Sequence, residues 1–141
     1  MAGGRSVRDD RDVLALLVVA ALVAALVHVY IFVLETLRWE AEATRRVFGT
    51  TAQEAATTRP LAANQGVYNL LLALVAAVGV VLLLAVRDGD AGPALVLAAC
   101  GSMLVAATYL VATDRTKVRA AAVQGTAPLV AVVATLVWLA A

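Results

Sequence analysis

Charged residues are scarce in this sequence: they make up 15% of its 141 residues, whereas soluble domains carry about 25%. Hydrophobic residues make up 63%, and a water-soluble fold of this length could not bury so much apolar surface. The formal net charge is only +1, which gives no electrostatic support to nucleic-acid binding. The composition therefore predicts a membrane protein with no nucleic-acid partner.

Cysteine and histidine are almost absent, since Cys100 and His28 are the single residues of their types. One thiol excludes an internal disulfide, and one histidine with scattered carboxylates gives no metal-ligand spacing. The sequence also lacks a phosphate-binding glycine loop and a nucleophile elbow. We therefore expect neither a metal nor a cofactor, and we interpret Cys100 as a buried structural thiol.

Long apolar runs dominate what is present, and about 20 such residues cross a bilayer core. Because backbone polar groups in lipid must be bonded within the chain, each run predicts a helix. The predicted spans are residues 13–36, 61–86, 93–113 and 120–140, with Pro60 in the first turn of the second helix. The length fits a single domain over residues 13–141, preceded by a polar tail over residues 1–12.

The connections between the spans predict how the helices are arranged. Residues 87–92 and 114–119 are short connections, so the helices that they join are antiparallel. The predicted fold is an all-α, polytopic membrane protein with four transmembrane helices in an up-down-up-down bundle. The connection from Glu40 to Arg59 is long and polar, and we expect it to continue the first helix past the membrane and return along the surface. It is either a solvated helix-turn or a lid whose Phe48 touches the bilayer or the mouth of the bundle.

Basic residues predict the orientation. Most of the eleven Lys and Arg residues lie on the face that carries the long loop, namely Arg38, Arg45, Arg46, Arg59, Arg115, Lys117 and Arg119. The positive-inside rule therefore predicts a multi-pass protein of the cell membrane with both termini extracytoplasmic. Arg5, Arg8 and Arg11, which precede the first span, oppose this orientation.

Polar and aromatic residues gather in the half of the bundle next to the long loop when the helices are laid out at 1.5 Å per residue. Hydrogen-bonding groups that faced lipid would lose their partners, so we expect them to point into the bundle. One stripe on the first helix comprises His28, Phe32, Glu35, Trp39 and Glu42; a second, on the next helix, comprises Gln65, Tyr68, Asn69 and Leu72. Facing each other, the stripes predict a cleft with a polar mouth, aromatic walls and an apolar floor.

Each of these residues also has a structural interpretation. His28 could be an interhelical hydrogen-bond donor, the amides could stabilise helix packing, and the aromatic residues could be interfacial anchors. Glu35 at the membrane edge either reaches water, pairs with Arg38 or an arginine of the loop, or stays protonated. These alternatives stay open at this point.

Several segments together resemble a known family. They are His28-Val29-Tyr30-Ile31-Phe32-Val33-Leu34-Glu35 followed by Trp39, Val47-Phe48-Gly49, Ala63-Asn64-Gln65-Gly66-Val67-Tyr68-Asn69, Ala107-Thr108-Tyr109 with Thr113, and Gln124-Gly125-Thr126-Ala127-Pro128. With them the chain resembles the bacterial and fungal membrane-protein family labelled domain of unknown function 1304. The resemblance covers nearly the whole chain after the first dozen residues. It implies a four-helix membrane fold and supplies no activity.

The polar half of the bundle favours an intramembrane enzyme that performs acid-base chemistry on an isoprenoid or another lipid-like molecule, by analogy with small terpene cyclases. Glu35, His28 and Asn69 are the predicted catalytic residues. Aromatic faces could stabilise a developing carbocation. The predicted substrate-binding residues are Phe32, Trp39, Asn64, Gln65, Tyr68, Tyr109 and Gln124.

Two other function classes compete with the enzyme. A carrier or channel for a small solute needs polar groups along a path through both halves of the membrane, and the other half is almost wholly Ala, Val and Leu. A homo-oligomer could still build a pore. The third class is a non-catalytic, lipid-binding membrane subunit. The expected partners are the bilayer and an apolar or amphiphilic small molecule.

Overall fold

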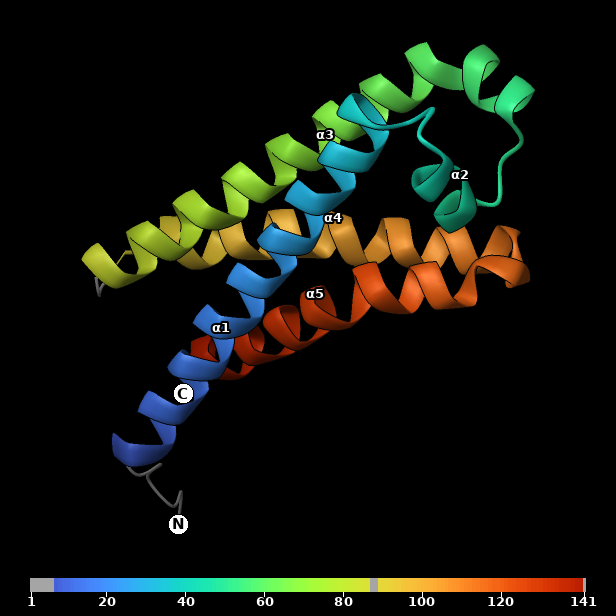
Figure 1. Ribbon diagram of the computed structural model, residues 1–141. Coiled ribbons are helices and arrows are strands. Elements are labelled where there is room, and N and C mark those ends of the chain that lie inside the picture. Colours follow the sequence, from blue (N-terminus) through green and yellow to red (C-terminus); the bar gives the residue numbers. More distant parts are fainter. Residues whose placement is uncertain (1–6, 87–88, 141) are drawn as a thin grey trace.

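The computed structural model describes residues 7–86 and 89–140, and every regular element within them is a helix. The predicted tail residues 1–6 and the turn residues 87–88 lie outside this range. The elements, in chain order, are α1 (Val7–Phe32), the π-helical turn η1 (Val33–Leu37), α2 (Glu42–Phe48), α3 (Ala52–Ala85), α4 (Ala91–Thr113), the 3-10 turn η2 (Arg115–Lys117) and α5 (Val118–Leu139) (Figure 1).

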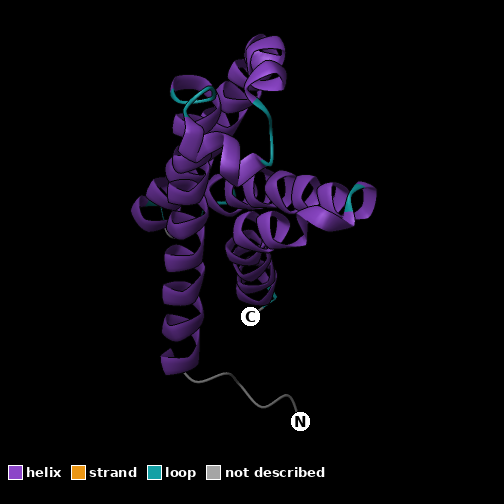
Figure 2. Ribbon diagram, turned by 45° about the vertical axis from the view of Figure 1, so that its right-hand side comes forward, coloured by secondary structure: helices purple, strands orange, loops and turns teal. Residues whose placement is uncertain are grey.

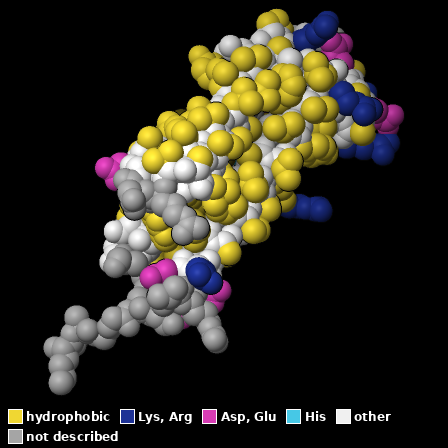
Figure 3. Space-filling model, turned by 90° about the vertical axis from the view of Figure 1, so that its left-hand side faces the viewer, with side chains coloured by type: hydrophobic (Ala, Val, Ile, Leu, Met, Phe, Trp, Pro, Cys, Tyr) yellow, Lys and Arg dark blue, Asp and Glu magenta, His cyan; other side chains and the backbone are white. Residues whose placement is uncertain are grey.

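Four helical segments are long and apolar enough to cross a bilayer: Asp9–Leu37, Ala52–Ala85, Ala91–Thr113 and Arg115–Leu139. They confirm the prediction of four transmembrane helices, and each begins earlier than predicted. The surface agrees with a membrane environment, because hydrophobic side chains form a broad band between charged groups at the two ends of the molecule (Figure 3). The chain is therefore an all-α, multi-pass membrane protein.

The start of α3 corrects one expectation, since Pro60 lies inside the helix rather than in its first turn. The helix begins at Ala52 because Thr51 forms a capping box with Glu54. The Thr51 hydroxyl accepts from the Glu54 backbone N–H at 3.2 Å, and the Thr51 N–H donates to the Glu54 carboxylate at 2.8 Å. Ala52–Arg59 consequently forms a polar helical extension ahead of the apolar run.

The four long helices form a ring in the order α1, α3, α4, α5: α1 packs against α3 and α5, and α4 packs against the same two helices. Figures 1 and 2 show α1 crossing the other helices steeply. Alanine dominates the core, where Leu17, Val96 and Met103 are among the few large side chains that are fully buried. Small core residues let helices in a membrane approach one another closely.

Glycines mark the closest helix contacts. A Cβ at Gly79 of α3 would lie 2.9 Å from the Val96 backbone nitrogen of α4, and a Cβ at Gly125 of α5 would lie 2.8 Å from the Ala107 Cβ. Gly101, on the outer side of α4, would meet nothing within 4 Å. The α3–α4 contact therefore depends on the absence of a side chain at Gly79.

We expect Gly79→Ala to destabilise the bundle by about 1–3 kcal/mol, the usual cost of overpacking. Gly101→Ala is the matched control and should be neutral or slightly stabilising, because its methyl group has free space and alanine favours the helix. Thermal unfolding of both variants in the same detergent measures the effect. Equal melting temperatures for the two variants would contradict the close α3–α4 contact.

Candidate functional site

The first membrane helix does not continue beyond the bilayer as expected. After Phe32 it passes into η1, and the backbone leaves the helical region at Arg38, where φ is −131° and ψ is 20°. Trp39 lies in the following turn, and Glu42 begins the separate helix α2, where it is exposed and forms a salt bridge with Arg46. The predicted stripe on a single straight helix is therefore wrong beyond Glu35.

The turn η1 packs directly against α3 through two side-chain hydrogen bonds. Asn69 Nδ2 donates to Glu35 Oε2 at 2.9 Å and also to the Gln65 carbonyl at 3.1 Å. The Thr36 hydroxyl donates to the Ala63 carbonyl at 3.2 Å. We call Glu35, Thr36, Gly66 and Asn69 the η1–α3 seam. π-Helical turns often occur at functional sites, so the seam is the candidate functional site.

Gly66 makes the seam possible. It is buried, and a Cβ at this position would overlap the Thr36 hydroxyl oxygen and lie 3.1 Å from both the Thr36 backbone nitrogen and the Glu35 Cβ. Any larger residue would push η1 away from α3. From the sequence, Gly66 stands out only as part of a motif, and Thr36 is not among the predicted site residues. The signal for Gly66 is that this glycine lies one turn before Asn69 in a polar run.

Glu35 is half-buried and has an amide as its partner. Two acidic residues that follow Glu35 in the sequence form salt bridges with described residues. Glu40 pairs with Arg59 at 3.4 Å, and Glu42 pairs with Arg46. Neither Arg38 nor an arginine of the loop forms a salt bridge with Glu35 in this part of the chain. A neutral N–H donor therefore holds this carboxyl, and no cation neutralises it.

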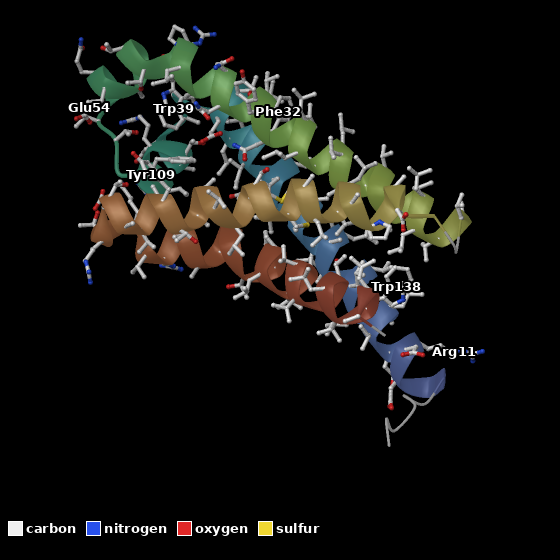
Figure 4. The ribbon with its side chains drawn as sticks, turned by 180° about the vertical axis from the view of Figure 1, so that it is seen from behind. Arg11, Phe32, Trp39, Glu54, Tyr109 and Trp138 are labelled. Carbon is white, nitrogen blue, oxygen red and sulfur yellow. The ribbon has the colours of Figure 1, made fainter. Side chains whose placement is uncertain are left out.

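A lid, formed by the turn at Trp39 and by helix α2, covers the end of the bundle next to the seam. Its helix α2 buries Thr44, and Phe48 stacks edge-on against Trp39 with ring centroids 5.0 Å apart. Trp39 lies at the end of the bundle that carries α2 (Figure 4). Its Nε1 donates to the Thr58 hydroxyl of α3 at 3.2 Å. Lys117 Nζ, from η2, donates to the Phe48 carbonyl at 2.8 Å. Phe48 thus contacts the bundle mouth, as one of the two interpretations of the long loop expected.

The turn that holds Lys117 is itself capped. The hydroxyl and the backbone N–H of Thr116 both donate to Asp114 Oδ1, at 2.6 and 2.9 Å. These two hydrogen bonds, the hydroxyl first, lower the pKa of Asp114 from its ordinary value. The carboxylate therefore stays ionised at neutral pH and keeps η2 in the conformation from which Lys117 reaches α2.

His28 is buried on the core face of α1. Its Nδ1 donates to the Ala24 carbonyl of the same helix at 2.8 Å. Because a carbonyl only accepts, the neutral ring carries its hydrogen on Nδ1 and its lone pair on Nε2. His28 precedes Glu35 by about 10 Å along the helix axis. The predicted catalytic residues Glu35 and Asn69 are brought together, whereas His28 lies apart from them.

The remaining predicted residues divide by exposure. Asn64, Gln65, Tyr68 and Tyr109 are exposed, the two tyrosines by 58% and 71%. Phe32, Trp39 and Gln124 are half-buried. The exposed members point outward from the bundle instead of lining a cleft between α1 and α3. Two open grooves in the described residues lie elsewhere, one between α1 and α5 and one on the outer face of α4, where Tyr109 lines one end.

A family model described as a protein of unknown function, DUF1304, matches residues 22–136, a range that includes the seam and the lid. No curated protein and no solved structure matches the chain.

A double-mutant cycle tests the attachment of the lid. Trp39→Phe keeps an aromatic ring against Phe48 but removes the indole donor, and Thr58→Val removes the acceptor. We expect each variant to lower the free energy of unfolding, with a coupling of about 1 kcal/mol, the usual net value of such a bond. Unfolding of the wild type, the two single variants and the double variant in one detergent measures the coupling. Additive effects would show that the Trp39–Thr58 bond does not form.

Proposed function

The chain belongs to the DUF1304 family of proteins of unknown function, and we propose that it is an intramembrane enzyme that uses Glu35 for acid-base chemistry on an isoprenoid or another lipid-like molecule. The observation that carries the proposal is the state of Glu35. It is a half-buried carboxyl at the end of a membrane helix, its partner is the Asn69 amide, and no residue in the described ranges forms a salt bridge with it.

General acid catalysis needs a carboxyl that carries its proton near neutral pH. A cation beside Glu35 would hold the group in its ionised form, whereas a neutral amide donor favours that form less strongly and still allows the carboxyl to carry a proton. Asn69 Nδ2 occupies Oε2, so Oε1 is the oxygen that would carry and deliver the proton. Asn69 then fixes which oxygen faces the substrate.

The reaction class that needs nothing beyond this acid is an isomerisation. Glu35 would transfer its proton to an alkene carbon or an epoxide oxygen of the substrate, and the resulting cation would rearrange or close a ring. Loss of a proton from a neighbouring carbon to the Glu35 carboxylate forms the new double bond and regenerates the acid. Substrate and product contain the same atoms and electrons, so no cofactor, oxidant or second substrate is required.

The surroundings of the seam support a substrate that arrives from the bilayer. Val67, Tyr68 and Leu71 are exposed on the outer side of α3 beside Asn69, and in a membrane this side faces lipid. A lipid-like molecule could place its polar end near Gln65 and Tyr68 and its apolar part along Leu71. The outward position of these side chains fits lateral approach better than an enclosed cleft.

A carrier or channel receives less support. In the far half of the bundle the described core is filled by apolar side chains such as Leu17, Ala21, Val80 and Ala131, and such a core offers no polar path for a solute. A homo-oligomer with a path between its subunits stays a prediction. A lipid-binding subunit without catalysis uses the same surface and is separated from the enzyme by measuring turnover.

We expect Glu35→Gln to fold normally and to lose at least about 100-fold in turnover, because the variant keeps the shape and the Asn69 contact but has no proton to transfer. Purified protein is incubated with a lipid extract of the source cells, and isomers that appear or disappear are followed by chromatography with mass detection. Glu42→Gln is the matched control, since Glu42 is an exposed carboxylate paired with Arg46.

Three results would count against the enzyme. Turnover that survives in Glu35→Gln would remove Glu35 from the chemistry. A lower melting temperature with unchanged turnover per folded molecule would assign it a structural role. Wild-type protein that retains a lipid from the extract without changing it would favour the lipid-binding subunit.

We also propose that the end carrying α2 and η2 faces the cytoplasm, which leaves both termini extracytoplasmic. The support is the basic residues of that end, which include Arg45 and Arg46 of α2, Arg59 of α3 and Lys117 of η2. Basic residues concentrate in cytoplasmic loops.

Cysteine labelling tests this orientation. Ala43→Cys, on the exposed side of α2, should react with an impermeant maleimide only after intact cells are permeabilised. Ala91→Cys, at the exposed start of α4 on the opposite end, should react in intact cells. The native Cys100 is fully buried and serves as the unreactive background. The opposite labelling pattern would reverse the orientation.

A further inference from the structure

We infer that Thr36 and Gly66 are positioning residues, which hold η1 on α3 so that Glu35 stays bonded to Asn69. The inference rests on the proposed role of Glu35 as the acid. Neither residue needs to touch the substrate: Thr36 bonds a backbone carbonyl of α3, and Gly66 provides the space in which η1 lies.

The geometry of η1 is unusual because two consecutive side chains contact two neighbouring turns of α3. In an α-helix neighbouring residues point about 100° apart and do not share a face. Here the Thr36 hydroxyl reaches Ala63, three residues before Gly66, and the Glu35 carboxyl reaches Asn69, three residues after it. The π-helical turn and the bare backbone at Gly66 together permit this arrangement.

The two hydrogen bonds therefore support each other across one glycine. Thr36 anchors η1 on one side of Gly66, which limits the positions that the Glu35 side chain can reach on the other side. If the anchor is lost, the carboxyl remains in the chain but is no longer confined to the Asn69 amide. Glu35 would then open away from α3 toward lipid.

The sequence predicts catalytic roles for Glu35 and Asn69 but gives no reason for the two side chains to be in contact. Thr36 supplies that reason, since its bond is the second point that fixes the rotation of η1 about its own axis. A helix turn held at one point can rotate, whereas one held at two points on either side of a close contact cannot. The same logic explains why functional groups are best supported by neighbouring hydrogen bonds.

The test uses the reactivity of Glu35 itself. Dicyclohexylcarbodiimide is an apolar reagent that enters membranes and modifies protonated carboxyl groups, and peptide mass spectrometry reports the rate at Glu35. We expect Thr36→Val, which keeps the shape of the side chain but removes its hydroxyl, to be labelled about 5-fold faster, the change in population that a typical hydrogen bond produces. Thr36→Ser restores the hydroxyl and should restore the wild-type rate.

Two further variants complete the design. Thr108→Val is the matched control: among the described residues the Thr108 hydroxyl bonds the Leu104 carbonyl of its own helix, so its loss should leave the Glu35 rate unchanged. Gly66→Ala should accelerate labelling at least as much as Thr36→Val where it folds. Because Gly66→Ala is severe, Thr36→Val, with a melting temperature measured in parallel, decides the question.

The outcomes separate the inference from the proposed function. Equal labelling rates for wild type and Thr36→Val, or no rescue by Thr36→Ser, would overturn the positioning role whether or not the protein turns over a substrate. A Glu35 that reacts neither in wild type nor in Thr36→Val would overturn it too. Altered labelling without any turnover in wild type would support the positioning role while the enzyme proposal fails.

Discussion

The close contact between η1 and α3 at Gly66 is the interaction on which the rest of the candidate site depends. A glycine at this position lets Thr36 and Glu35 reach the two neighbouring turns of α3. Without that approach Glu35 would be an unpaired carboxyl at the membrane edge. With it, the carboxyl gains a neutral amide partner in place of a cation.

The lid continues the same contact toward the aqueous end. Trp39 follows η1 directly, bonds Thr58 of α3 and packs against Phe48 of α2, and Lys117 fixes α2 to the turn before α5. Residues from three separate parts of the sequence therefore close one end of the bundle above Glu35. The opposite half has an apolar, alanine-rich core.

Particular residues show which features of this end of the bundle follow from the sequence and which do not. Depth along the membrane follows from counting residues along helices, so Glu35 and Asn69 were correctly expected at the same level. Rotation about a helix axis depends on packing, and one extra residue in η1 changes it. Trp39 and Glu42 leave the predicted stripe because the helix ends at Arg38, and Gln65 and Tyr68 face outward because of the way α3 packs in the bundle. The early start of α3 could have been predicted, because Thr51-Ala52-Gln53-Glu54 has the spacing of a capping box.

The sequence by itself determined that this protein lies in a membrane as four helices, because apolar runs of this length leave the backbone no other way to satisfy its hydrogen bonds in lipid. It also determined which end carries the polar residues. Only the tertiary structure decided that Glu35 meets Asn69 and that His28 does not join them. That outcome depends on the space at Gly66 and on the π-helical turn, and both arise from contact between segments that are distant in the chain.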